Sequence, residues 1–342
     1  MKTRRYEPID VSPPQTRVAD PGLPLKVLQV TVDERGAGQR LDNFLGRILK
    51  DVPRSHIFRV IRKGEVRING KRAKPEARLQ ANDIVRVPPV RTGDKAPPRR
   101  APGALVQSVI GSIVHEDPQL LVIDKPAGVA VHGGSGVSFG VIEALRAARP
   151  DENLELVHRL DRDTSGLLLV ARKRSSLRTL HALMRDGEVE KKYLALVKGK
   201  WALGKKRIDV PLRTDIRVGG ERTVKADASG KDAVSVFKPV QFFGKKASLV
   251  EVSLETGRTH QIRVHATHAG YPLAGDEKYG EPEFNERMKA LGLERMFLHA
   301  HQLSFVGPES GVEFSASAPL PADLAAVIDA LSVKRGGGQG RE

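Results

Sequence analysis

The chain has 342 residues, which is longer than a typical single domain, so two domains are expected. It carries 57 Lys and Arg against 41 Asp and Glu, a net charge of +16 with a pI near 10.1, which predicts a polyanionic partner such as nucleic acid or an anionic membrane surface. The absence of cysteine excludes disulfides and thiolate metal sites and fits a cytoplasmic protein.

The sequence argues against the membrane alternative. No apolar run approaches the roughly 18 residues of a spanning helix, and no basic amphipathic helix with aromatic anchors is evident. Residues 1–14 lack the apolar core of a secretory signal. Nucleic acid is therefore the expected partner, and no membrane is.

Residues 1–25 are polar and proline-rich and are expected to be disordered. A first domain is predicted over residues 26–90. It starts with an amphipathic helix whose apolar positions follow an i, i+3, i+4, i+7, i+8 spacing from Leu41 and which ends near Pro53. A second helix is expected to begin with Ser55 as N-cap and to end at Gly64 in a left-handed cap.

A hairpin and a strand complete this predicted domain. Asn69-Gly70, preceded by alternating apolar and polar residues, is a strong signal for a two-residue hairpin turn. Residues 84–87 (IVRV) are expected to form a strand just before two prolines.

The charge of the first domain is one-sided. Between Arg40 and Arg91 there are fourteen Lys and Arg and five Asp and Glu, so a net +9 of the +16 lies in under a sixth of the chain. Two helices leading into a basic hairpin resemble the S4 RNA-binding module, through RLDNFL at 40–45 and VIRKGEVRING at 60–70. Such a surface binds RNA by phosphate contacts and shape. The expected RNA-binding residues here are Arg54, Arg59, Arg62, Lys63, Arg67, Lys71, Arg72 and Lys74.

Residues 91–105 are predicted to form a proline-rich linker, residues 106–332 a second domain, and residues 333–342 a disordered tail. The second domain is rich in expected strands. They are placed at 113–114, 120–123, 167–170, 193–197, 233–237, 249–254 and 261–264, with helices at 140–148 and 175–184. This alternation favours an α+β fold with a mostly antiparallel mixed sheet, a few covering helices and a central active-site cleft.

A polar cluster in residues 156–170 (LVHRLDRDTSGLLLV) is the strongest candidate site. A tight loop held by a buried strand is a common way to present catalytic groups. The plain alternative is that Asp161 and Asp163 merely shape and cap a turn. The spacing also matches the first positions of a calcium-binding EF-hand loop. We reject calcium because position 12 of such a loop requires Glu and is Arg172 here.

No motif for a metal or a nucleotide cofactor is present: there is no P-loop, GxGxxG, HExxH or GxSxG. His260, His265 and His268 are the one tempting set of metal ligands. On the strand expected at 261–264, residues 260 and 265 would point to opposite faces, so no zinc site is predicted. Carboxylate chemistry without a cofactor remains.

The motif HRLDRDTSG at 158–166 resembles the signature of the pseudouridine synthases that modify large-subunit ribosomal RNA. The likeness extends, in the family's order, over about residues 26–332 and is greatest to the family's synthase C branch. The other motifs that carry it are DKPAGVAVHGGSG at 124–136, KKYLALVKG at 191–199, ETGRTHQIRVH at 255–265 and FLHAHQLSF at 297–305.

The resemblance implies roles for four residues. Asp161 corresponds to the essential catalytic carboxylate, and Arg263 to an arginine that forms a salt bridge with it. Tyr193 corresponds to the aromatic residue that stacks on the detached base, and Arg159 to the arginine that takes the place of the flipped nucleotide in the RNA. From the residues alone, Arg263 could equally be a solvated strand arginine, and Tyr193 a core residue.

The resemblance further implies the isomerisation of uridine to pseudouridine at more than one site of 23S ribosomal RNA, without a cofactor or metal. A monomer is expected, but the sequence does not determine the oligomeric state. Whether the substrate is free RNA or a precursor particle stays open. Two alternatives remain: a non-catalytic ribosome-assembly factor that binds RNA, and a carboxylate-dependent RNA hydrolase. The set of Asp161, Tyr193 and Arg263 disfavours the first, and the lack of a clearly placed second acid disfavours the second.

Overall fold

The computed structural model describes residues 27–34, 36–49, 52, 54–89, 101–134, 137–216, 222–307 and 311–333. The chain divides into two compact units, with the boundary between Arg99 and Arg100. The tail expected at 1–25 lies outside the described residues, as does all but the first residue of the tail expected at 333–342. Among the described residues, no helix is long and apolar enough to cross a membrane.

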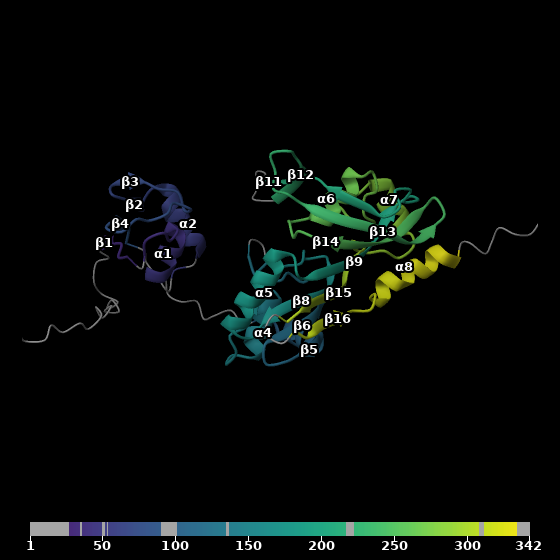
Figure 1. The fold of residues 1–342 in the computed structure, drawn as a ribbon, viewed down its shortest axis with the longest axis horizontal. Coiled ribbons are helices and arrows are strands. Elements are labelled where there is room, and N and C mark those ends of the chain that lie inside the picture. Colours follow the sequence, from purple (N-terminus) through teal and green to yellow (C-terminus); the bar gives the residue numbers. More distant parts are fainter. Residues whose placement is uncertain are drawn as a thin grey trace, which may run out of the picture. The chain divides into compact units, whose positions relative to one another are not determined.

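The N-terminal unit packs two helices against a small antiparallel sheet (Figure 1). Its helices are α1 (Leu41–Ile48) and α2 (Arg54–Lys63). In spatial order, its strands are β1 (Leu28–Thr31), β4 (Ile84–Val87), β2 (Arg67–Ile68) and β3 (Lys71–Arg72). The apolar stripe of α1 lies in the core of this unit, with Leu41, Phe44 and Leu45 all buried, as the spacing predicted. Strand β1 was not predicted.

The turns of this unit are formed where the sequence placed them. Asn69 and Gly70 both have positive φ (49° and 77°) and join β2 to β3, as a type I′ turn requires. Gly64 has φ +75° after α2, which confirms the left-handed cap. The Ser55 cap is wrong: α2 already begins at Arg54, so Ser55 lies in its first turn.

The C-terminal unit is organised around a ten-stranded sheet in which the described pairs are antiparallel except β8 with β15. Its main path runs β10 (Lys206–Asp209), β13 (Val234–Phe243), β14 (Ala247–Leu254), β9 (Glu190–Lys198), β15 (Leu298–Val306), β8 (Ser165–Ala171), β6 (Leu120–Lys125) and β5 (Ile113–Glu116). At the side, β16 (Glu313–Ser317) pairs with β15, and β7 (Glu155–Leu156) pairs with β8. A separate hairpin comprises β11 (Leu212–Ile216) and β12 (Arg222–Ala226). This confirms the mostly antiparallel α+β prediction.

Six helices accompany this sheet in the described part of the C-terminal unit. They are α3 (Gly103–Gly111), α4 (Val141–Ala148), α5 (Arg174–Asp186), α6 (Gln261–His268), α7 (Pro282–Lys289) and α8 (Ala322–Val333). Figure 1 shows α4 and α5 beside β6 and β8, and α6 and α7 beside β13 and β14. Helix α3 was not predicted, and its start at Gly103 shortens the linker expected at 91–105.

The sheet is buried on both faces, and alternate residues of each strand enter different cores. On β8, Leu168 and Val170 join a core shared with α3, α4 and α6, whereas Leu167 and Leu169 join a core shared with α5. On β9, Tyr193 belongs to the first of these cores. Tyr193 therefore lies on the face of the sheet that α6 covers.

The strand predicted at 261–264 is wrong, because these residues form the start of α6. Ile262 and Val264 alternate with polar neighbours, which mimics a strand. The buried face also includes two polar residues four apart, Gln261 and His265, whose burial depends on hydrogen bonds. A hydrophobicity pattern does not show such positions, so the helical period was missed.

Gly166 lets β8 approach β15 in the parallel pair. Its φ is +107°, and a Cβ there would lie 2.2 Å from the carbonyl oxygen of Ala300. In the same pair, Ser165 Oγ lies 2.9 Å from Nδ1 of His299, a fully buried residue whose Nε2 lies 3.3 Å from the carbonyl oxygen of Ala318. This contact ties the first residue of β8, directly after the loop of Asp161, to β15 at the centre of the sheet.

We expect His299 to make the unit sensitive to acid. Burial lowers its pKa to about 4, against about 6.5 in an unfolded chain. The stabilisation is therefore complete above pH 6.5 and is lost as the pH falls towards 4, by on the order of 3 kcal/mol. Denaturant unfolding at pH 7 and pH 4.5 should show a smaller loss for His299→Asn than for the parent protein. Equal losses would contradict this assignment.

Candidate active site

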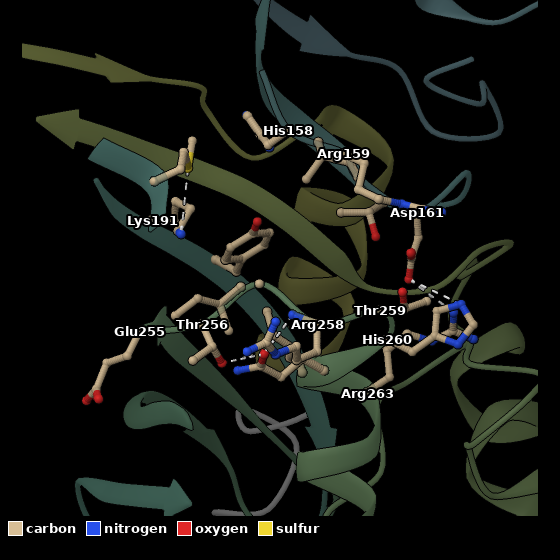
Figure 2. A pocket seen from close by; sticks show the side chains of 18 of the residues that line it. His158, Arg159, Asp161, Lys191, Glu255, Thr256, Arg258, Thr259, His260 and Arg263 are labelled. Atoms are coloured by element: carbon tan, nitrogen blue, oxygen red, sulfur yellow. Dashed lines mark hydrogen bonds and ion pairs between the residues drawn. The ribbon is translucent and has the colours of Figure 1, made fainter. Parts of the chain in front are cut away.

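A cleft of about 530 Å³ opens in the C-terminal unit. Its walls are the loop at 157–161, the start of β9 and the segment at 254–263, which leads into α6. Figure 2 shows Asp161 facing His260 at one side of this cleft, with Lys191 and Glu255 at the other. All three residues that were predicted to be catalytic line it: Asp161, Tyr193 and Arg263.

Local contacts fix the loop that carries Asp161. Its carbonyl oxygen accepts a hydrogen bond from the amide of Thr164 (3.2 Å), which closes a turn just before β8. The ring of His158 accepts a hydrogen bond from the amide of Leu169 through Nε2 (3.0 Å), which fastens the loop to β8. His158 thus has a structural role at the edge of the cleft.

Lys125, at the end of β6, also anchors the loop that carries Asp161. It is fully buried, and its Nζ donates to the carbonyl oxygens of Pro126 (2.8 Å), Val129 (2.8 Å) and Arg162 (3.0 Å). Burial lowers the pKa of Lys125 to about 7, with nearby carboxylates acting in the opposite direction. Because three carbonyls match the three N–H groups of an ammonium, we assign the charged form. Lys125 thus joins the loop after β6 to the loop of Asp161.

Arg263 lies on α6 and connects two carboxylates. Its Nη1 is 3.3 Å from Oδ2 of Asp161, and its Nε and Nη2 donate to the two oxygens of Asp276 at 2.8 and 2.7 Å. Burial works to lower the pKa of Arg263, but Asp276 and then Asp161 outweigh it and raise that pKa. The guanidinium is therefore a permanent cation beside Asp161.

The sequence reasoning missed Asp276. Its side chain is only 1% exposed, and it also accepts hydrogen bonds from the amides of Lys278 and Tyr279. Burial works to raise the pKa of Asp276, but Arg263 and these amides lower it overall. A bidentate pair of this kind fixes both the position and the plane of a guanidinium. An acidic residue thirteen positions after the arginine, on a loop, offers no signal in the sequence.

Tyr193 is 7% exposed and borders the cleft from β9. Burial, followed by the charge of Asp161, raises the pKa of its hydroxyl above the usual range, so the phenol is neutral. Arg159 is exposed and also lines the cleft. Tyr193 is therefore part of the wall of the cleft, whereas the side chain of Arg159 is accessible to solvent at its rim.

Gln261 secures the wall opposite Asp161. Its Oε1 accepts hydrogen bonds from the hydroxyl of Thr256 (2.7 Å) and the amide of Arg258 (2.9 Å). Its Nε2 donates to the carbonyl oxygen of Val234 and the hydroxyl of Ser235, both at 2.9 Å. The loop at 256–258 is thereby pinned to β13. This role was not predicted, because the residue was placed on a strand.

The three histidines that were considered for zinc do not converge. His265 is fully buried, and its ring contacts the hydroxyl of Ser235 through Nδ1 (3.0 Å) and the carbonyl oxygen of Val210 through Nε2 (3.0 Å). Both nitrogens are therefore engaged. No group of three or more metal-ligating side chains occurs among the residues that the structure describes.

The second acid of the motif lies apart from the cleft wall. Asp163 forms an ion pair with Arg162 at 3.0 Å, and both side chains are well exposed. It is not among the lining residues.

Apart from Arg159, which lines the cleft, the predicted RNA-binding residues lie in the N-terminal unit. Seven have exposed side chains: Arg59, Arg62, Lys63, Arg67, Lys71, Arg72 and Lys74. The side chain of Arg54 lies outside the described part. Arg72 also has a structural role, since its Nη2 donates to the carbonyl oxygen of Arg62 (3.1 Å) and its Nε would be 2.3 Å from a Cβ at Gly64.

Comparisons with known proteins fit this geometry. A family model described as RNA pseudouridylate synthase matches residues 119–268, and a model of the S4 domain matches residues 39–85. Two human structures resemble the chain: RNA pseudouridylate synthase domain containing 4 (TM-score 0.56, 67% of this chain, 96% of that chain) and domain containing 1 (0.54, 71% and 100%), each 26% identical. Fold and motifs thus define the class, a pseudouridine synthase domain that follows an S4 domain.

Curated relatives narrow the class. Ribosomal large subunit pseudouridine synthase C of Pasteurella multocida is 51% identical over 310 residues, covering 89% of this chain and 94% of the relative. The protein of the same name from Escherichia coli K12 is 49% identical over 311 residues, covering 90% and 97%. The chain belongs to the RNA pseudouridine synthase family, in the branch of these large-subunit synthases.

Proposed function

We propose that this enzyme isomerises specific uridines of 23S ribosomal RNA to pseudouridine, at more than one position and without a cofactor, with Asp161 as the catalytic carboxylate. The observation that carries the proposal is the contact of Asp161 with Arg263 in a cleft that Tyr193 also lines. The printed names of the curated relatives support a large-subunit RNA substrate. We further propose that the enzyme acts as a monomer, with the carboxylate, the cation and the aromatic residue of the site all within one catalytic domain.

The reaction needs an ionised carboxylate in a partly enclosed pocket. The N1–C1′ bond breaks, the uracil turns, C5 bonds to C1′, and a proton leaves C5 while N1 gains one. Asp161 could attack C1′, attack C6, or remove the C2′ proton, and all three routes start from the carboxylate. Its side chain is 20% exposed, and the guanidinium of Arg263 lies 3.3 Å from it. Arg263 places a fixed positive charge beside the carboxylate without a metal.

Tyr193 and Arg159 are proposed to handle the base and the RNA. A neutral phenol ring in the wall of the cleft offers a flat face on which a detached uracil can turn without leaving. The target uridine must first leave its stack in the RNA. Arg159, exposed at the rim and two residues before Asp161, is suited to take the vacated place.

The hydrolase alternative loses support from the positions of the other carboxylates. Asp276 is buried and held by Arg263, and Asp163 faces solvent beside Arg162, so neither is placed to activate water in the cleft. Glu255 lines the cleft, on the side away from Asp161, and its carboxylate is paired with Arg207. A protein that only binds RNA would not need the buried pair of Arg263 and Asp276 to hold a guanidinium beside the accessible carboxylate of Asp161.

The S4 domain is proposed to supply much of the RNA affinity. Residues 1–105 carry 23 Lys and Arg and 11 Asp and Glu, so a net +12 of the +16 precedes the catalytic domain. Positive side chains that face solvent neutralise phosphates and release counterions when RNA binds. The seven exposed cations described above are suited to this role.

We expect Asp161→Asn to abolish turnover and to preserve RNA binding, because the amide keeps the shape and removes the charge. Tritium release from [5-³H]uridine-labelled 23S RNA, measured in EDTA without added nucleotide, should fall to background. The matched control is Asp163→Asn on the same turn, which should retain turnover. Activity in Asp161→Asn, or loss in both variants, would refute the assignment.

We expect the double variant Arg59→Glu, Lys71→Glu to weaken RNA binding and to flatten its salt dependence. Each lost phosphate contact reduces the slope of log K against log salt by about 0.7–0.9. Single-turnover rates at saturating RNA should be unchanged. Arg287→Glu, Lys289→Glu on α7 makes the same change of charge in the catalytic domain as a control. Equal slopes for the two double variants would argue against the proposed role of the S4 domain.

A further inference from the structure

His260 occupies an unusual position beside the proposed catalytic carboxylate. It precedes α6 with φ +54°, in the left-handed region that non-glycine residues seldom adopt. Its Nε2 lies 3.8 Å from Oδ2 of Asp161, and its Nδ1 lies 2.8 Å from the hydroxyl of Tyr279. The strained backbone thus places an imidazole between a carboxylate and a phenol.

The hydroxyl of Tyr279 lies between the backbone amide of Val224, which donates to it at 2.9 Å, and Nδ1 of His260 at 2.8 Å. We assign the O–H of Tyr279 as the donor to Nδ1, because its oxygen already accepts from Val224 and its single hydrogen then has an acceptor. A neutral imidazole that accepts at Nδ1 carries its hydrogen on Nε2. That N–H faces Asp161.

The charges around His260 agree with a neutral ring. Burial lowers its pKa, Arg263 and Lys278 act in the same direction, and Asp161 and Asp276 act against them. A neutral imidazole with its hydrogen on Nε2 can donate a hydrogen bond to a carboxylate. Because it is a very weak acid, it does not transfer that proton to the carboxylate. Figure 2 shows His260 and Arg263 approaching Asp161 together.

Tyr279 contacts both groups that face Asp161. The guanidinium of Arg263 lies over its ring, 5.0 Å from the centroid, and the ring of His260 meets it edge-on at 5.5 Å. We propose that Tyr279 is a positioning residue for the isomerisation. Its hydroxyl holds His260 as an Nε2–H donor directed at Asp161, and its ring packs against the guanidinium of Arg263. His260 is thereby placed to serve as a second donor to the proposed catalytic carboxylate, with its Nε2 at 3.8 Å from Oδ2, just beyond direct hydrogen-bond distance. The inference rests on the proposed role of Asp161.

Tyr279→Phe tests this role because it keeps the ring beneath Arg263 and removes the hydroxyl that orients His260. Single-turnover assays should show the rate at saturating RNA falling about tenfold, the effect of one misdirected hydrogen bond, with RNA affinity unchanged. The matched control is Tyr271→Phe. That hydroxyl accepts from the amide of Ala202 (3.3 Å) and the ring packs on Trp201, so the same atom is removed at a structural site.

A double-mutant cycle with His260→Asn shows whether Tyr279 acts through His260. Asparagine tolerates the left-handed backbone and is too short to place a donor at the position of Nε2. If the hydroxyl works through the ring, the double variant should be no slower than His260→Asn alone. His260→Gln, whose amide reaches about as far as Nε2, should recover part of the rate.

The outcomes separate the inference from the proposed function. If Asp161→Asn is inactive while Tyr279→Phe keeps the parental rate, the positioning role is wrong and the isomerase mechanism stands. Additive losses in the double variant, or a fall in rate matched by Tyr271→Phe, would also overturn it. If Tyr279→Phe fails to fold, the comparison of His260→Asn with His260→Gln decides, and equal rates in the two contradict a donor at Nε2.

Discussion

The contact between Arg263 and Asp161 is the interaction on which the proposed active site depends. It joins the cation on α6 to the carboxylate on the loop before β8, two segments that lie 102 residues apart in the chain. A single ion pair of this kind across a partly open cleft would be loose. The bidentate contact of Arg263 with the buried Asp276 removes that freedom, since it fixes the guanidinium before any RNA arrives. Asp276 therefore positions the guanidinium of Arg263 beside Asp161, without a proposed role in the reaction itself.

The scaffold brings the two sides of this contact together through the parallel pair of β8 and β15. Gly166 permits the close approach, and His299 and Lys125 hold the flanking loop through buried hydrogen bonds. The other side is held through Gln261, which pins the loop before α6 to β13. These contacts use buried polar groups, whose loss would leave unsatisfied partners in the interior. The walls of the cleft are thus held in place by hydrogen bonds between polar groups that are buried within the apolar core.

The sequence was sufficient to predict those elements that have a local signal and those site residues that belong to a recognisable motif. The apolar stripe of α1, the Asn69-Gly70 turn and the run of leucines in β8 are local, and each was predicted. Asp161, Tyr193 and Arg263 were singled out because their motifs resemble a known family. The start of α6 was misread because Gln261 and His265 are buried through hydrogen bonds, which hydrophobic periodicity does not show. Asp276 and Tyr279 could not be found, since their importance arises from packing against residues brought near only by the fold.

The proposed chemistry requires the geometry of Arg263 as well as its charge. Arg263→Lys keeps a positive charge but cannot span two carboxylates with a planar fork. We expect the single-turnover rate at saturating RNA to fall about 10²-fold, the scale that a displacement of about 1 Å at a reacting centre can cause, with RNA affinity retained. A lysine variant that turns over at the parental rate would contradict the central claim that Arg263, fixed by Asp276, prepares Asp161 for reaction.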